Sequence, residues 1–418
     1  MENKKRILVL GAGALQVPLI NRIKSLGYET CVVSLYGDEP GMVIADHPII
    51  GDYCEEEEML QVAHKWNVSG IAIDQTDLPV RTAAFVAEQL GLPGIGYKTA
   101  QLFTDKYAMR ERCRQLGIPT LRYQEINNIQ QARDFFVQTG DVILKPVSNQ
   151  GSKGVYRATS IKELEQKYEE ATRYSRGLPV MIEEFVEGEE LVIESCVMDG
   201  NVQMLTCGDT FYFNIPDTYS ANMRLFPSKK DKSIVSKAES LNKKIIEGFG
   251  LQHGITHGEY IIRDGEVYLI EIAARGGGVY ISSHIIPLMT GFDSLQFIVN
   301  NAIGLPTQMS VANTHQIACY VAFYLPEGTV THVAGIDEVQ HLPYVCQSNL
   351  DSLYVGKHCP KNTDKTSRYF MVLQAPSYEK LSEDISTIQS MLDIKVEYEG
   401  SQRKIIWDSE KYMSKVNH

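Results

Sequence analysis

The segment HGEYIIRDGEVYLIEIAARGGG, residues 257–278, contains two apolar runs separated by a tight turn. The dipeptide Asp264-Gly265 is typical of a two-residue hairpin turn, because both residues tolerate a positive φ. We therefore expect antiparallel strands over residues 257–263 and 266–272. Their isoleucines and leucine indicate that both strands are buried.

Two glutamates, Glu259 and Glu271, lie on the two expected strands. Pairing about the turn places residue 259 near residue 270, so a bulge or local twist would bring the two carboxylates to one face. Buried carboxylates repel each other unless a cation lies between them, and oxygen ligands close to phosphate select Mg²⁺. The pair therefore predicts a Mg²⁺ site, with Mn²⁺ as an alternative metal. The competing interpretation is an edge hairpin with solvated acids.

The turn after the second strand contains Arg275 followed by three glycines. A guanidinium beside a metal can hold a transferred phosphoryl group or a carboxylate. We therefore expect Arg275, Gly276 and Gly277 to contact substrate. His257 precedes Glu259 by two residues and could orient a substrate or carry a proton, although a structural histidine is the more common interpretation.

A phosphate-binding feature lies upstream, where an expected strand over residues 141–145 ends in Lys145. It runs into the loop SNQGSKG, residues 148–154. Glycines let backbone N–H groups approach phosphate, and lysines supply positive charge. The spacing differs from that of a Walker A motif. This pattern predicts polyphosphate binding, with a flexible hairpin loop as the alternative.

An acidic stretch follows, in which Glu183, Glu184 and Val186 precede Glu190. One interpretation is a half-exposed strand and turn. The other is a hinge whose backbone N–H and C=O groups bind an adenine edge, with a carboxylate that reaches the ribose.

The N-terminal region alternates short apolar strands with amphipathic helices. This alternation predicts a doubly wound parallel sheet of the α/β class. Gly11 and Gly13 follow the first strand, but Gln16 stands where a dinucleotide-binding fingerprint has its third glycine. The loop is therefore more consistent with a wall of a substrate site than with an NAD site.

We expect three domains: a Rossmann-like domain over residues 1–98, a central α+β domain over 99–305, and a C-terminal α+β domain over 306–418. Within the central domain we expect a lid subdomain at about 120–187. A single helix is expected over 99–116, and it carries Lys106.

The bulk composition narrows the function classes. The 418-residue chain has a formal net charge of −12, which argues against general binding to nucleic acid or anionic membranes. Its eight cysteines form no CxxC pair, which is typical of reduced thiols in a cytoplasmic protein. No apolar run is long enough to predict a membrane span.

Taken in order, Lys106, Lys145-Pro146, SNQGSKG, EEFVEG, HGEY and EIAARGGG resemble the ATP-grasp superfamily of ligases. The resemblance covers about residues 1–305 and continues into the C-terminal segment. It implies a central ATP-grasp fold, with ATP and Mg²⁺ as ligands.

Position by position, the resemblance also implies roles for individual residues. Lys106 and Lys145 would contact the ATP phosphates, and Ser152 and Gly154 would lie in the loop that covers them. Glu183, Glu184 and Val186 would line the adenine, and Glu190 would bind the ribose. Arg275 would stabilise the acyl phosphate. Glu259 and Glu271 would hold Mg²⁺. Ala273 stands where many members have an asparagine ligand, which puts a second Mg²⁺ in doubt. The Glu-x-Ala-Ala-Arg form is similar to that of the L-amino acid ligases.

The expected reaction is ATP-dependent ligation of a small carboxylate to an amine, through an acyl phosphate, with release of ADP and phosphate. An amino acid is the expected substrate, and a homodimer is common in the family. The alternatives are a thiol or carrier-protein acceptor, a carboxylase, or a non-catalytic nucleotide-binding module.

Overall fold

The computed structural model of the protein describes residues 4–147, 154–175, 177–215, 220–307, 310–312, 314–360 and 367–408. Contacts divide the chain into two compact units. The first comprises Met1–Leu205, Asp231–Ser283 and Phe292–Ser310, and the second comprises Thr206–Lys230, His284–Gly291 and Val311–His418. The three-domain division expected from the sequence stays a prediction.

The first unit begins with a parallel sheet of order β3-β2-β1-β4, as the sequence pattern predicted. Its strands are β1 (Arg6–Leu10), β2 (Glu29–Ser34), β3 (His47–Ile50) and β4 (Gly70–Ala72). The helices between them are α1 (Val17–Ser25), α2 (Pro40–Ile44), α3 (Glu56–Trp66) and α4 (Val80–Leu90). The loops after β1 and β4 leave the sheet at the same edge, because all four strands are parallel.

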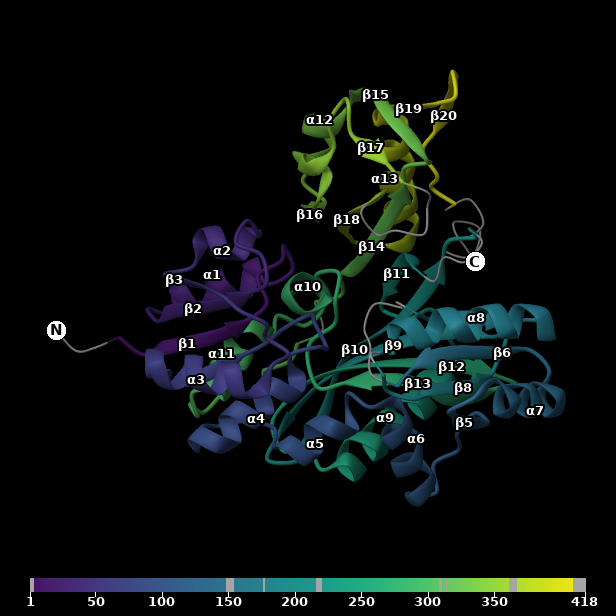
Figure 1. The fold of residues 1–418 in the computed structure, drawn as a ribbon. Helices are drawn as coiled ribbons and strands as arrows, with labels where there is room; N and C mark the ends of the chain where they lie inside the picture. Colours follow the sequence, from purple (N-terminus) through teal and green to yellow (C-terminus); the bar gives the residue numbers. More distant parts are fainter. Residues whose placement is uncertain are drawn as a thin grey trace. The chain divides into compact units, whose positions relative to one another are not determined.

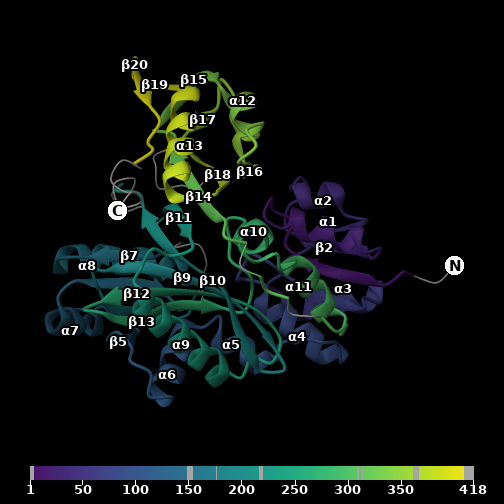
Figure 2. The same ribbon diagram turned by 180° about the vertical axis from the view of Figure 1, so that it is seen from behind.

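Alternate residues of β1 point to opposite faces, so each face has its own apolar core. Ile7 and Val9 pack with residues of α1 on one face, and Leu8 and Leu10 pack with residues of α3 and α4 on the other. Helix α11 (Ser294–Ala302) joins the first of these cores through Val299. Figures 1 and 2 show α11 beside this sheet, although it lies more than two hundred residues later in the chain.

The expected lid subdomain contains an antiparallel sheet of order β5-β8-β6-β7, with two helices packed on it. The strands are β5 (Tyr123–Ile126), β6 (Val142–Pro146), β7 (Tyr156–Ala158) and β8 (Val180–Glu184), and the helices are α7 (Ile129–Thr139) and α8 (Ile161–Tyr174). Lys145 therefore lies near the end of β6, and Glu183 lies near the end of β8.

A second antiparallel sheet in the first unit has the order β13-β12-β9-β10. Its strands are β9 (Glu189–Met198), β10 (Asn201–Tyr212, which continues into the second unit), β12 (Gly254–Arg263) and β13 (Glu266–Ala273). Helices α5 (Tyr97–Leu102), α6 (Lys106–Gln115) and α9 (Lys232–Phe249) accompany it. The prediction of one helix over 99–116 was wrong. The Asp105 side chain accepts a hydrogen bond from the Ala108 N–H and starts α6 as a separate helix.

The second unit pairs the end of β10 with strands in the order β11-β14-β18-β16. These are β11 (Ala221–Phe226), β14 (Ile317–Tyr324), β16 (Val345–Ser348) and β18 (Arg368–Ala375). A smaller sheet has the order β17-β15-β19-β20, with β15 (Gly328–Ala334), β17 (His358–Cys359), β19 (Asp393–Tyr398) and β20 (Ser401–Lys404). The helices of the second unit are α10 (Ile286–Thr290), α12 (Ile336–Gln340) and α13 (Tyr378–Met391).

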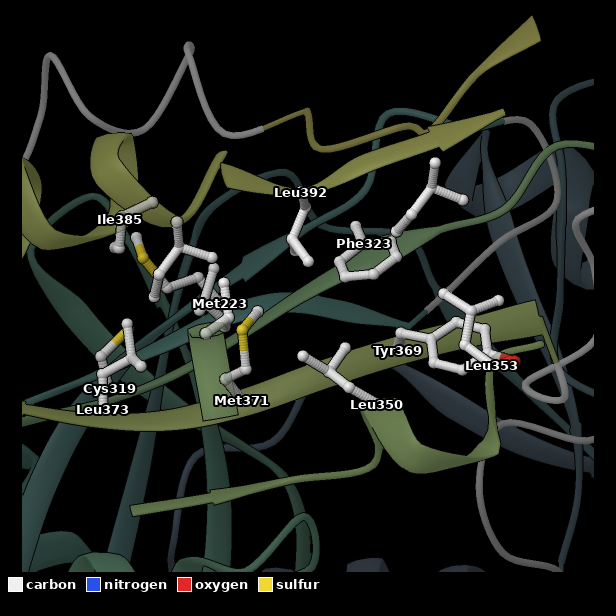
Figure 3. Close-up of a cluster of buried hydrophobic side chains, with 14 of the residues drawn as sticks. Met223, Cys319, Phe323, Leu350, Leu353, Tyr369, Met371, Leu373, Ile385 and Leu392 are labelled. Carbon is white, nitrogen blue, oxygen red and sulfur yellow. The ribbon is translucent and has the colours of Figure 1, made fainter. Parts of the chain in front are cut away.

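An extensive apolar core packs within the second unit (Figure 3). Phe323, Met371 and Leu373 from the larger sheet pack with Ile385 of α13 and Leu392 before β19. Met223 and Leu225 of β11 belong to the same core, so the C-terminal region shares it with an earlier segment of the chain. No helix in the described part of the chain is both long and apolar enough to cross a membrane.

Candidate active site

The two glutamates expected to hold Mg²⁺, Glu259 and Glu271, lie directly opposite each other on β12 and β13. The ladder pairs Tyr260 with Leu269, and then shifts so that Glu259 pairs with Glu271. This shift is a β-bulge at Ile270. Counting residue pairs from the turn would pair Glu259 with residue 270, so the bulge is what brings Glu259 opposite Glu271. The Glu259 and Glu271 side chains are 25% and 33% exposed, so they are only partly buried and a ligand can reach them.

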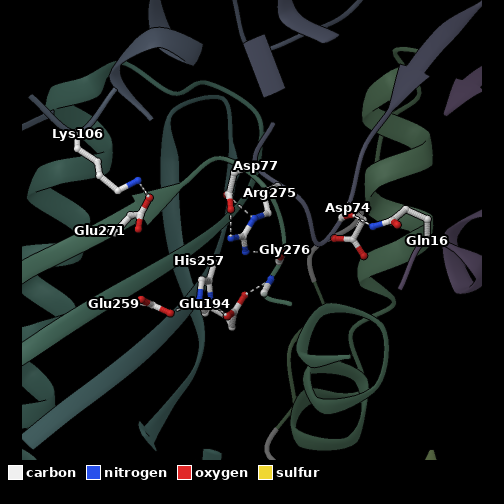
Figure 4. A network of polar contacts seen from close by, with 11 residues as sticks. Gln16, Asp74, Asp77, Lys106, Glu194, His257, Glu259, Glu271, Arg275 and Gly276 are labelled. Carbon is white, nitrogen blue, oxygen red and sulfur yellow. Dashed lines mark hydrogen bonds and ion pairs between the residues drawn. The ribbon is translucent and has the colours of Figure 1, made fainter. Parts of the chain in front are cut away.

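Each of these glutamates has its own cationic or titratable partner (Figure 4). The Lys106 Nζ lies 2.7 Å from Glu271 Oε1, and His257 Nε2 lies 3.2 Å from Glu259 Oε1. Lys106 is the first residue of α6, and Asp105 caps that helix start. The partners neutralise two acids that face each other across the ladder.

His257 is buried between two carboxylates. Its Nδ1 contacts Glu194, a fully buried residue of β9, while its Nε2 contacts Glu259. Burial alone would lower the pKa of His257, but the nearby Glu194 carboxylate raises it above the ordinary value. Glu194 also accepts a hydrogen bond from the Gly277 N–H at 3.0 Å. This one carboxylate therefore connects the metal-site strand to the glycine-rich turn.

Lys145 belongs to a second buried ion cluster. Its Nζ contacts Glu183, and the Arg110 Nε donates to Glu183 Oε1 at 2.6 Å. Burial would raise the pKa of Glu183, but Arg110 and Lys145 hold it below the ordinary value. Arg110 also donates from Nη2 to the carbonyl of Ile270 at 2.6 Å. Ile270 is the bulge residue, so Arg110 links the lid sheet to the feature that positions Glu271.

The expected adenine-binding residues surround the end of β8. The N–H groups of Glu184 and Phe185 donate to Arg122 and Asp141, at 2.9 Å and 2.8 Å. The Glu184 carboxylate pairs with the Arg122 side chain at 3.0 Å. Val186 packs instead in a small apolar cluster with Leu121 and Ile261. Glu190, the expected ribose ligand, pairs with Ile261 along the β9–β12 ladder.

The expected phosphate loop is only partly described. Ser152 lies outside the described residues. Gly154 has a φ of +74°, and an added Cβ would lie 2.8 Å from the Tyr174 Cβ. Glycine is therefore required at this end of the loop.

Arg275 is bound by Asp77, a pairing that the sequence pattern did not predict. Its Nε and Nη2 donate to the two carboxylate oxygens of Asp77, at 2.7 Å and 2.9 Å, and its Nη1 donates to the Gly276 carbonyl at 2.9 Å. Asp77 lies in the loop after β4. Burial would raise the pKa of Asp77, but Arg275 lowers it below the ordinary value. This two-point contact fixes the plane of the guanidinium.

Hydrogen bonds also connect the loops after β1, β4 and β13. The Gln16 side chain donates to the Asp74 carbonyl at 2.9 Å, and the Gln75 side chain accepts from the Tyr280 N–H at 2.8 Å. Asp74 is fully buried, and burial raises the pKa of its carboxyl to about 7. Gln16 stands where a dinucleotide-binding fingerprint has its third glycine, and its side chain joins the loop after β1 to the loop after β4.

The donor set suits a metal held together with phosphate. Among the described residues no group of three or more His, Cys, Asp and Glu side chains could hold a metal ion. The two opposed carboxylates would supply part of a Mg²⁺ shell, and phosphate oxygens and water would complete it. Ala273 pairs with His257 on the ladder and offers no side-chain oxygen.

Residues 138–283 match the ATP-grasp domain family. The formate-dependent phosphoribosylglycinamide formyltransferase of Sulfurisphaera tokodaii is 24% identical over 356 residues, which are 82% of this chain and 87% of that protein. The alanine–anticapsin ligase of Bacillus subtilis is 26% identical over 247 residues, which are 53% of this chain and 51% of that protein.

Solved structures share the fold over nearly the whole chain. An L-amino acid ligase from Bacillus licheniformis has a TM-score of 0.78 at 20% identity, covering 95% of this chain and 100% of its own. A phosphoribosylglycinamide synthetase from Anaerococcus prevotii has a TM-score of 0.74 at 20% identity, covering 94% and 100%. The match over residues 138–283 identifies an ATP-grasp domain in this chain, and the solved structures show that nearly the whole chain shares the fold of the L-amino acid ligase and the phosphoribosylglycinamide synthetase.

Proposed function

We propose that the protein is a carboxylate–amine ligase that joins a small acid, with an amino acid as the favoured substrate, to an amine at the expense of ATP. The pairing of Glu259 with Glu271 across the bulge carries the proposal. It provides two reachable carboxylates, with Lys106 beside one of them and Arg275 just beyond the end of β13.

The reaction has two steps. A carboxylate oxygen of the acid attacks the γ-phosphorus of ATP, and the bond to ADP breaks. The amine nitrogen then attacks the acyl carbon, the carbon–oxygen bond breaks, and phosphate leaves as the nitrogen loses a proton. Such an enzyme acts by positioning its reactants and by neutralising charge.

In this proposal Glu259 and Glu271 would hold Mg²⁺, which neutralises phosphate charge when it is bound. Lys106 lies beside Glu271 and would exchange part of that contact for a phosphate oxygen. Lys145 keeps Glu183 as its partner and presents its remaining N–H groups to phosphate. Asp77 and the Gly276 carbonyl together leave one N–H on each terminal nitrogen of Arg275 for the acyl phosphate.

For the nucleotide base, Val186 and the apolar cluster around it are the proposed adenine wall. The N–H groups of Glu184 and Phe185 already have backbone partners, so hydrogen bonding to the base falls to Val186. Glu190 is the proposed ribose ligand. Ser152 and Gly154 are the proposed phosphate-loop contacts, and His257 and the backbone of Gly276 and Gly277 are proposed near the substrate.

A panel of amino acids, supplied singly and in pairs with Mg²⁺ and ATP, tests the proposal. ADP release that requires both an acid and an amine, with an amide detected by mass spectrometry, is the expected result. ADP release with a thiol acceptor or with bicarbonate would support the thiol-ligase or carboxylase alternative instead. No ADP release with any set would favour a nucleotide-binding module.

The similarity to the formate-dependent formyltransferase, which spans 82% of this chain, supports a second candidate. Here the acid would be formate and the amine would be a phosphoribosyl glycinamide. The same panel separates the two candidates when formate and this amine are included, because an amino acid ligase should not release ADP with them.

A further inference from the structure

The first unit contains a cavity of about 560 Å³ that is separate from the phosphate-binding side of the site. Its apolar walls come from β4 and the residue after it, from α4 and α11, and from the start of β12, and they include Ile73, Val80, Ala84, Ile255, Ile298 and Ala302. Pockets that hold small organic molecules have volumes of about 300–1,000 Å³ and mostly apolar walls, so the size and the lining fit such a ligand.

The cavity borders the proposed catalytic site at the turn after β13 and at the start of β12. Ala274, Arg275 and Gly276 border it, while the described residues that line it do not include Lys106, Lys145 or either metal-site glutamate. A ligand in the cavity would therefore leave the nucleotide position free. It would nevertheless contact the turn that carries Arg275.

Two polar features bear on the chemistry of the ligand. Asn301 lines the cavity, and its buried Nδ2 has no hydrogen-bond partner in the described part of the chain. A buried donor without a partner destabilises the folded chain, and a ligand with an acceptor would offset that cost. Exposed lining residues mark the mouth: Asp199, His253 and Leu305, the last an apolar side chain that is 41% exposed.

The geometry points to a binding site for an apolar small molecule that carries a hydrogen-bond acceptor for Asn301 and binds together with the nucleotide. This site is additional to the proposed ligase reaction. Occupancy fills the space behind Ala274–Gly276 and so restrains the turn that holds Arg275. The ligand acts as an effector of the catalytic turn, because it contacts that turn without reaching the phosphate side.

The test uses the full chain and the fluorescent probe 8-anilinonaphthalene-1-sulfonate, which has apolar rings and acceptor oxygens. We expect one probe to bind per chain, with and without saturating MgATP. Ala84→Leu and Ala302→Met fill the cavity from opposite walls and should each weaken probe binding at least about tenfold. Asn301→Leu removes the donor and should weaken binding about fivefold.

The matched control is Gln89→Leu, which adds the same apolar side chain at an exposed position of α4 and should leave probe binding unchanged. Near-ultraviolet circular dichroism confirms that each variant is folded. Stoichiometric displacement of the probe by MgATP would overturn the proposal, as would unchanged affinity in both filled variants or no binding to the native chain. Because fluorescence binding needs no turnover, this result is independent of the ligase proposal.

Discussion

The two glycines after Arg275 leave room for the side chains that build the site. A Cβ on Gly276 would lie 2.2 Å from the Ser282 hydroxyl and 2.6 Å from an Asp74 carboxyl oxygen. A Cβ on Gly277 would lie 2.4 Å from Glu194 Oε1 and 2.9 Å from His257 Nδ1. The glycine-rich turn is therefore required for close packing against polar groups, and its neighbours are the residues that position the metal-site strand.

Gly277→Ala should displace Glu194 and His257. We expect it to lower the free energy of unfolding by about 1–3 kcal/mol and to slow ADP release. Gly278→Ala is the control, because nothing lies within 4 Å of its added Cβ. Urea denaturation and steady-state kinetics of both variants check this prediction, and equal behaviour of the two would contradict the geometry described for the turn.

Glu271→Gln removes a metal-site charge and keeps the shape of the side chain. We expect ADP release to fall about 10²–10³-fold, the usual cost of losing one group that stabilises transition-state charge. Glu266→Gln on the same strand is the control, since Glu266 is exposed and pairs with Lys237 at the surface. Steady-state ADP assays compare the two, and a Glu271→Gln enzyme with native turnover would exclude the metal-site assignment.

At the scale of elements, the ion cluster of Arg110, Lys145 and Glu183 joins α6, β6 and β8 to the bulge in β13. Arg110 contacts both Glu183 and the Ile270 carbonyl, so one side chain links the lid sheet to the register of Glu271. Breaking a buried pair leaves an uncompensated charge and costs about 3–5 kcal/mol. The lid sheet and the metal-site hairpin should therefore lose stability together.

The same cluster predicts an acid dependence of stability. Its cations hold the pKa of folded Glu183 below the ordinary value of 4.5, so as the pH falls the unfolded chain takes up a proton first. The contribution of Glu183 is therefore fully present above pH 4.5 and is lost as the pH falls through its folded pKa.

Glu183→Gln should be less stable at neutral pH and should lose less stability on acidification than the native chain. Urea denaturation at a series of pH values on both sides of 4.5 measures the two slopes. Glu184→Gln, at a carboxylate whose partner Arg122 has a mostly exposed side chain, is the control. Identical slopes for the native chain and Glu183→Gln would contradict the assignment.

At the scale of the whole molecule, local patterns predicted the parallel N-terminal sheet, the hairpin of β12 and β13, and the mixture of helices and strands in the C-terminal region. Strands and turns of this kind depend on residues that are close in sequence, so periodicity and turn chemistry are sufficient. Short elements such as α2 and β3 were missed because four or five residues show no clear period. Helix α7 was missed as well, although Asn128 caps its start.

The contacts that complete the site could not be predicted in this way. Asp77 contacts Arg275, which lies 198 positions later in the sequence, and Glu194 contacts His257, which lies 63 positions later. A single acidic residue in a loop carries no signal of its partner, and packing of the N-terminal sheet with α11 brings the two loops together only after folding. The sequence therefore predicts candidate phosphate and metal ligands, which stay predictions, but it does not predict the residues that position those candidates.

The most informative measurement traces the carboxylate oxygen atoms of the acid into the products. An acid that supports ADP release is labelled with ¹⁸O in both carboxylate oxygens, and the phosphate product is examined by mass spectrometry. Attack of the carboxylate on the γ-phosphorus, followed by loss of phosphate from the acyl carbon, predicts one ¹⁸O atom in each phosphate released and the other in the amide carbonyl. Amide formation with unlabelled phosphate would contradict an acyl phosphate intermediate and, with it, the proposed ligase mechanism.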